Sequence, residues 1–160
     1  MLLRSLCHLA PFAVQLALAA PAMAQMNIDG VNSCLSERLA AGQTPATCVD
    51  EAHSACTAVN SDRPAVATLC FVEVEKDWQS GIAALMTTIK EKANEDIAAV
   101  AGVEGKYDLL SALLQCSRME ELAVIVGRES DDAIQRQTAR CKANAAGLTY
   151  ARLFLRSRNL

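Results

Sequence analysis

Six cysteines follow the first 24 residues of the chain, and they restrict its fold more than any other feature of the sequence. They are Cys34, Cys48, Cys56, Cys70, Cys116 and Cys141. An even number of cysteines in an exported chain predicts a disulfide framework, here of three bonds. No two of them show the Cys-x2-Cys or Cys-x4-Cys spacing typical of zinc ligands, so we expect no metal site.

The chain begins with a pattern typical of a secretory signal peptide. Arg4 precedes an apolar run over residues 9–20, and Ala22-Met23-Ala24 forms a small-x-small triplet. We expect cleavage after Ala24, which leaves 160 minus 24, or 136, residues in the periplasm or outside the cell. The alternative, a membrane anchor, is disfavoured because the apolar run is too short to span a bilayer.

Apolar residues in the remaining chain recur at helical spacing, and no stretch alternates as a strand would. We therefore predict an all-α fold over residues 25–160, a small disulfide-stapled domain with one long central helix and helical hairpins. The long helix is expected over Pro64–Ala101, where Phe71, Val74 and Trp78 begin an apolar stripe. Gly81 lies within it and indicates either a close helix contact or a kink.

Shorter helices are expected on both sides of this central one. The pattern predicts helices over residues 31–41 and 45–59 before it, and over residues 107–126 and about 131–156 after it. The glycine-containing segment 102–105 is expected to break the chain after the long helix.

The cysteines lie at equal distances from the expected turns. Cys34 and Cys48 are symmetric about residue 41, Cys56 and Cys70 about residue 63, and Cys116 and Cys141 about the point between residues 128 and 129. Residues at equal distances from the turn of a helical hairpin face each other. We therefore predict the pairs Cys34–Cys48, Cys56–Cys70 and Cys116–Cys141, one of many connectivities that six cysteines allow.

The expected mature chain is acidic, and its charge is unevenly distributed. Residues 25–132 carry 8 basic and 18 acidic residues, a net charge of −10, whereas residues 133–160 carry 6 basic and no acidic residues. The basic segment is expected to pair with the acidic remainder and to complement a helix C-terminus. Nucleic acid is a poor candidate partner for an exported, acidic chain with few aromatic residues.

The sequence contains no catalytic motif that we can identify, such as a nucleophile elbow or a phosphate-binding loop. His53, the only histidine after residue 24, has no second imidazole as a partner, so we expect a surface or cap-adjacent residue. Trp78 is expected to be a core anchor rather than a ligand platform. We predict no enzyme activity, no cofactor and no catalytic residue.

Two segments resemble the LprI-type lysozyme-inhibitor domain of exported bacterial proteins. In the first, CFVEVEKDW, Cys70, Glu73 and Trp78 match the cysteine, acidic residue and tryptophan at the start of a long helix in that family. In the second, CKANAAGLTYAR, the family's terminal cysteine and Leu-Thr-x-x-Arg match Cys141, Leu148, Thr149 and Arg152. Between them the family has Trp-x-x-x-Arg-Asp-x-x-Cys, whereas this chain has Val124, Arg128-Glu129 and Asp132 at the corresponding positions.

The resemblance implies a helical, disulfide-stapled periplasmic protein that in some members inhibits lysozyme. Its partner would be a cationic lysozyme, whose charge suits an acidic domain. The alternative is an envelope structural or interaction domain with another protein partner. In either case no stable membrane insertion is expected.

Overall fold

The computed structural model describes residues 26–158 and 160, so the expected signal peptide lies outside the described chain. Over these residues it contains six helices and no strand, which confirms the all-α prediction. The helices are α1 (Ile28–Ala40), α2 (Ala46–Ala52), α3 (Ser54–Thr57), α4 (Pro64–Lys92), α5 (Glu95–Val126) and α6 (Asp131–Ser157). None of the described helices is both long and apolar enough to cross a membrane.

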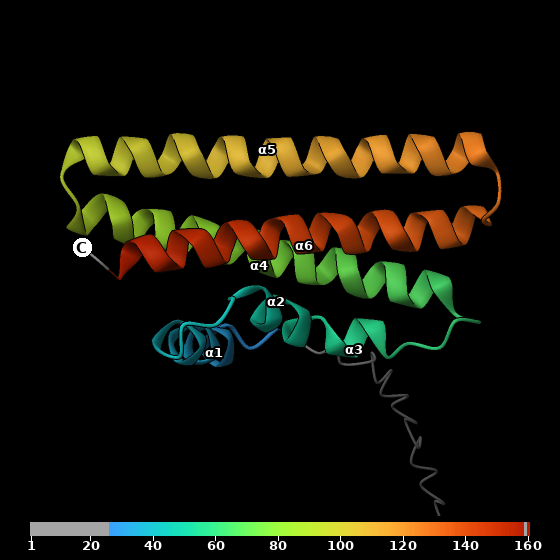
Figure 1. The fold of residues 1–160 in the computed structure, drawn as a ribbon, viewed down its shortest axis with the longest axis horizontal. Helices are drawn as coiled ribbons and strands as arrows, with labels where there is room; N and C mark the ends of the chain where they lie inside the picture. The colour runs from blue at the N-terminus through green and yellow to red at the C-terminus, as the bar shows by residue number, and fades with distance from the viewer. Residues whose placement is uncertain (1–25, 159) are drawn as a thin grey trace, which may run out of the picture.

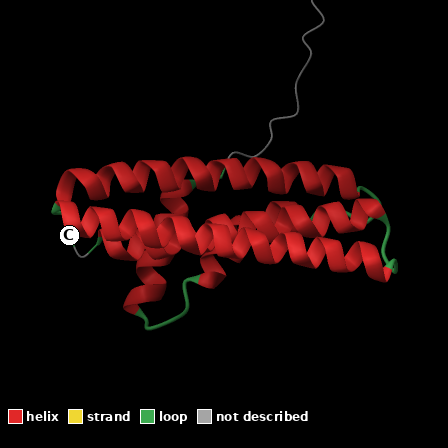
Figure 2. Ribbon diagram, turned by 90° about the horizontal axis from the view of Figure 1, so that it is seen from above, coloured by secondary structure: helices red, strands yellow, loops and turns green. Residues whose placement is uncertain are grey.

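The helices form three layers (Figure 1). Helix α5 lies on one side, α4 and α6 lie next to each other in the middle, and α1–α3 cover the opposite side. The three long helices lie along one common axis, and a short helical segment runs across this axis (Figure 2). Because α6 packs against both α4 and α5, it is the central element of the fold.

The expected helix over Pro64–Ala101 is wrong in its C-terminal boundary. Helix α4 ends at Lys92, and Ala93 and Asn94 adopt extended backbone with ψ values of 162° and 163°. The Asn94 side chain then accepts a hydrogen bond from the backbone N–H of Ile97 and caps α5. The sequence signal for this boundary is Asn94 followed by two acidic residues, a typical helix start.

The expected break at residues 102–105 does not occur, because both glycines lie within the continuous helix α5, in ordinary van der Waals contact with neighbouring helices. A Cβ atom at Gly102 would lie 3.5 Å from Met86 Cε, and one at Gly105 would lie 3.4 Å from Leu153 Cδ2. The chain instead turns after α5 at Gly127, which has a φ of 63° and therefore favours glycine.

The expected helix over residues 45–59 is also divided into two. Helix α2 ends at Ala52, His53 caps it with φ −92° and ψ 0°, and α3 begins at Ser54. The first helix, α1, begins earlier than expected because Asn27 accepts a hydrogen bond from the backbone N–H of Gly30.

All three predicted disulfides are present. Their Cα–Cα distances are 5.9 Å for Cys34–Cys48, 5.4 Å for Cys56–Cys70 and 5.7 Å for Cys116–Cys141, within the usual range. The first joins α1 to α2, the second joins α3 to α4, and the third joins α5 to α6. The two N-terminal bonds therefore attach the short helices, which have little core of their own, to each other and to α4.

The core lies between the middle layer and the short helices. Trp78 is 0% exposed, which confirms it as a core anchor, and its ring centroid lies 5.2 Å from that of Tyr150 on α6. A Cβ atom at Gly81 would lie 2.8 Å from Tyr150 Cε2, so this glycine marks a close helix contact within an uninterrupted α4. Small residues on α6, including Gly147 and Ala151, allow the neighbouring helices to approach.

Candidate functional site

Three polar side chains, of which Trp78 and His53 are buried and Asn144 is half-buried, link the α2–α3 junction to α4 and α6. Trp78 Nε1 on α4 donates to His53 Nε2 over 2.8 Å, and His53 Nδ1 lies 2.8 Å from Asn144 Oδ1 on α6. Because the indole N–H can only donate, His53 Nε2 must accept, which leaves the proton on Nδ1 to be donated to Asn144. The histidine is therefore neutral, and both of its ring nitrogens are occupied.

The expectation that His53 is a surface residue is wrong. Its backbone is the cap between α2 and α3, as the cap-adjacent alternative proposed, but its side chain is only 1% exposed. It packs edge-on against Phe71, with ring centroids 6.0 Å apart. Sequence reasoning missed this because the partners, Trp78 and Asn144, are 25 and 91 residues away.

Burial lowers the pKa of His53 below its ordinary value of 6.5, although the hydrogen bond to Asn144 opposes this shift. On Tyr150, burial raises the pKa above 10.0, and the phenol donates to Asn32 Oδ1 over 2.6 Å. Both groups are thus held in their neutral forms, and both connect the short-helix layer to the long helices.

The lowered pKa of His53 predicts a loss of stability in weak acid. The unfolded chain protonates His53 near pH 6.5, whereas the folded chain resists protonation until a lower pH. The free energy of unfolding should therefore be constant above about pH 6.5 and should fall as the pH drops from there toward the folded-state pKa. Urea unfolding of residues 25–160, from about pH 8 to about pH 5.5, measures the effect.

His53→Gln is the control for this pH dependence. His53 is the only histidine after residue 24, so this variant should show a nearly flat profile over the same range. An equal slope in the variant would contradict the assignment to His53.

The residues that match the LprI-type sequence motifs lie on different elements of the fold. Glu73 pairs with Lys76 over 2.8 Å on α4, and Arg152 on α6 pairs with Asp108 over 2.8 Å. Thr149 is buried and donates to the carbonyl of Ala145 over 2.9 Å. Arg128 is exposed in the turn between α5 and α6, and Leu148 is 36% exposed.

These residues do not form one cluster, but two of the motif segments meet in the core. Trp78 packs against Gly147 and Tyr150, which flank the Leu148-Thr149 pair in the sequence. Trp78 and the segment around Leu148-Thr149 therefore serve the contact between α4 and α6. Arg152–Asp108 and Arg156–Glu104 are the ion pairs by which the basic α6 holds the acidic α5.

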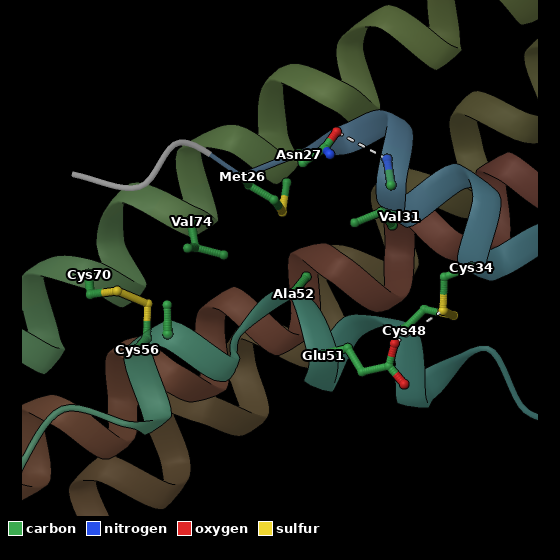
Figure 3. Close-up of a pocket in the computed structure, with 12 residues that line it drawn as sticks. Met26, Asn27, Val31, Cys34, Cys48, Glu51, Ala52, Cys56, Cys70 and Val74 are labelled. Carbon is green, nitrogen blue, oxygen red and sulfur yellow. Dashed lines mark hydrogen bonds between the residues drawn. A yellow bond between two sulfur atoms is a disulfide. The ribbon is translucent and has the colours of Figure 1, made fainter. Parts of the chain in front are cut away.

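A pocket of about 300 Å³ opens between α1, the α2–α3 segment and α4 (Figure 3). Val31, Ala52 and Val74 contribute apolar walls, and both N-terminal disulfides border it. At one edge, the backbone N–H of Met26 donates to Asp77 Oδ2 over 3.0 Å. Since the two disulfides join the helices that form the walls, the pocket is arranged in advance of any binding event.

Glu51 is the charged residue among those lining the pocket, and it is exposed. Its carboxylate pairs with Arg38 over 3.2 Å and lies 3.6 Å from the sulfur of Cys34. The contact with sulfur is one of van der Waals type, because a disulfide sulfur carries no proton. The surrounding chain is acidic as well, since residues 26–80 contain eight acidic and three basic residues, a net charge of −5.

The described residues contain no group of three or more histidine, cysteine, aspartate or glutamate side chains that could hold a metal ion. Comparison of the chain with protein-family models, with curated protein sequences and with solved structures finds no match.

Proposed function

We propose that the protein is an exported, non-catalytic binding protein that captures a cationic protein, and that a lysozyme-like enzyme is this partner. The observation that carries the proposal is the apolar pocket bordered by two disulfides within an acidic layer. Three disulfides fit an oxidising compartment outside the cytoplasm, which is where a lysozyme acts. The periplasm is the proposed location.

The size and lining of the pocket suit one or two protruding apolar side chains of a partner. A volume of about 300 Å³ lies at the lower end of the range for small-molecule sites. Val31 and Val74 provide apolar contact, and Glu51 at the wall offers a carboxylate to a basic residue beside the inserted side chain. The net charge of −5 over residues 26–80 would accelerate encounter with a cationic surface.

The binding proposal predicts that filling the pocket abolishes inhibition. Ala55 lines the pocket and is exposed, so Ala55→Phe should occupy the space without disturbing the core. We expect the oxidised wild-type protein, in stoichiometric excess, to suppress lysis of peptidoglycan by hen-type lysozyme. We expect Ala55→Phe to weaken this inhibition by about tenfold or more, a loss of about 1.4 kcal/mol of binding free energy.

The matched control is Ala83→Phe, which adds the same side chain at an exposed position of α4 that does not line the pocket. It should inhibit as the wild type does. Absence of protection by the wild-type protein would exclude lysozyme as the partner. Equal inhibition by both variants would exclude the pocket as the binding site.

A further inference from the structure

A second pocket lies between α3, α4 and α6, and its charge is opposite to that of the pocket near Glu51. Its volume is about 260 Å³, and the two pockets have only Cys56 in common among their lining residues. Four other pockets of the described chain each have at least one glutamate in their walls, whereas this one has none. We call it the basic pocket, and its lining includes Cys56, Thr57, Val59, Phe71, Arg136 and Arg140.

The two arginines of the basic pocket have no acidic partner among the described residues. Arg136 and Arg140 are four residues apart, so they lie on one face of α6, where like charges repel each other. Neither guanidinium forms an ion pair within the described chain, although Asp132 lies one turn before Arg136. Glu129 instead accepts a hydrogen bond from Gln137 over 3.3 Å. Because Arg136 is half-buried, its charge is partly removed from water without compensation.

The position of the two arginines on α6 explains why the acidic α5 does not neutralise them. Arg152 and Arg156 follow them by 16 residues each, and this spacing turns the helix by about 160°. That later pair binds carboxylates of α5, so Arg136 and Arg140 point away from α5, toward α3 and α4. The exposed side chains on the outer face of α5 are mostly apolar and include Val103, Tyr107 and Leu110. Unlike that face, the basic pocket specifies the charge of a ligand.

We propose that the basic pocket binds a small organic anion that carries one carboxylate or phosphate group next to an apolar substituent. The planar guanidinium groups of Arg136 and Arg140 match either oxyanion, to which arginine donates paired hydrogen bonds. The apolar substituent lies against Val59 and Phe71 in this arrangement. A volume of about 260 Å³ is below the usual range for ligand sites, so the ligand is comparable in size with a single amino acid.

The buried His53 reports on the occupancy of this site. Burial is the main cause of its lowered pKa, and the charge of Arg140 lowers the pKa further, whereas Asn144 and Asp50 raise it. A bound anion offsets the charge of Arg140 and therefore raises the pKa of His53. Since His53 is the only histidine after residue 24, the NMR signals of its ring report this change without overlap.

Titration of isotope-labelled residues 25–160 with small ligands, followed by NMR, tests the proposal. We expect N-acetyl-leucine and phenyl phosphate to shift the amide signals of Thr57 and Val59 and to raise the pKa of His53. N-acetyl-leucinamide, which lacks the charge, and acetate, which lacks the apolar group, should bind at least about tenfold more weakly. The tighter binder of the first two shows whether the site prefers a carboxylate or a phosphate.

Arg136→Gln and Arg140→Gln should each weaken the binding of N-acetyl-leucine and phenyl phosphate by about tenfold, because each removes charge-assisted hydrogen bonds. Arg158→Gln is the matched control, since it removes the same charge from the exposed C-terminal end of α6. It should bind both ligands as the wild type does. Circular dichroism of each variant reports that the helices are intact.

Three results would overturn the proposal. They are the absence of binding of both anions at about 10 mM, equal affinity for the uncharged amide or for acetate, and unchanged binding by the two arginine variants. None of these results depends on lysozyme, because the assay contains no partner protein and leaves the pocket near Glu51 unaltered.

Discussion

Replacement of His53 by leucine is expected to lower the free energy of unfolding by about 1 to 3 kcal/mol, because it leaves the buried indole N–H of Trp78 without its acceptor. Asn144 Oδ1 also loses its donor, but this side chain is only half-buried, so water can replace the lost hydrogen bond. Urea unfolding at about pH 8, where His53 is neutral in both states, measures the loss.

A double-mutant cycle separates this hydrogen bond from simple loss of packing. Trp78→Phe removes the indole N–H, so the leucine in the double variant no longer leaves that donor unpaired. The double variant should therefore be more stable than the sum of the two single effects predicts, by about 0.5 to 3 kcal/mol. Strict additivity would show that Trp78 and His53 contribute independently.

Replacement of Gly147 by alanine is expected to lower the free energy of unfolding by about 1 to 3 kcal/mol. The new Cβ would lie 2.6 Å from Val49 Cγ1 and 3.0 Å from Trp78 Cε2, and α2 would have to move away from α6. Alanine favours a helix interior by about 1 kcal/mol over glycine, so the sign of the measured change shows which effect is larger.

Gly102→Ala is the matched control, because it makes the same change within a long helix. Its Cβ would meet only Met86 Cε at 3.5 Å, an ordinary contact. This variant should raise the free energy of unfolding by up to about 1 kcal/mol. Destabilisation of similar size in both variants would contradict the claim that close packing makes Gly147 essential.

The structure also shows why some sequence-based expectations were correct and others were not. The disulfide pairing was predictable because the two cysteines of each pair lie at equal distances from a turn, a local property that the chain order preserves. The boundary between α4 and α5 was misplaced because Gly102 and Gly105 look like helix breakers. Both glycines lie inside α5 in ordinary contact with side chains of α4 and α6, and the boundary lies instead at the Asn94 cap.

Some features of the candidate site were predictable from the sequence and others were not. The tryptophan was expected to be a core anchor because a single large aromatic residue on an apolar stripe is usually buried. The burial of His53 was not predictable, since a polar side chain between Asp50 and Ser54 gives no periodic signal. The pocket near Glu51 was not predicted either, because its walls come from three separate segments.

The sequence by itself determined the all-α class, the three disulfide pairs and the acidic character of the N-terminal half, because helical periodicity, hairpin symmetry and charge are properties of local spacing. Only the tertiary structure decided that Gly81 and Gly147 lie at close helix contacts, that His53 lies between Trp78 and Asn144, and that α5 keeps an apolar outer face. Each of these depends on which residues distant in sequence come within a few ångströms of one another. That arrangement is set by the packing of α6 against α4 and α5.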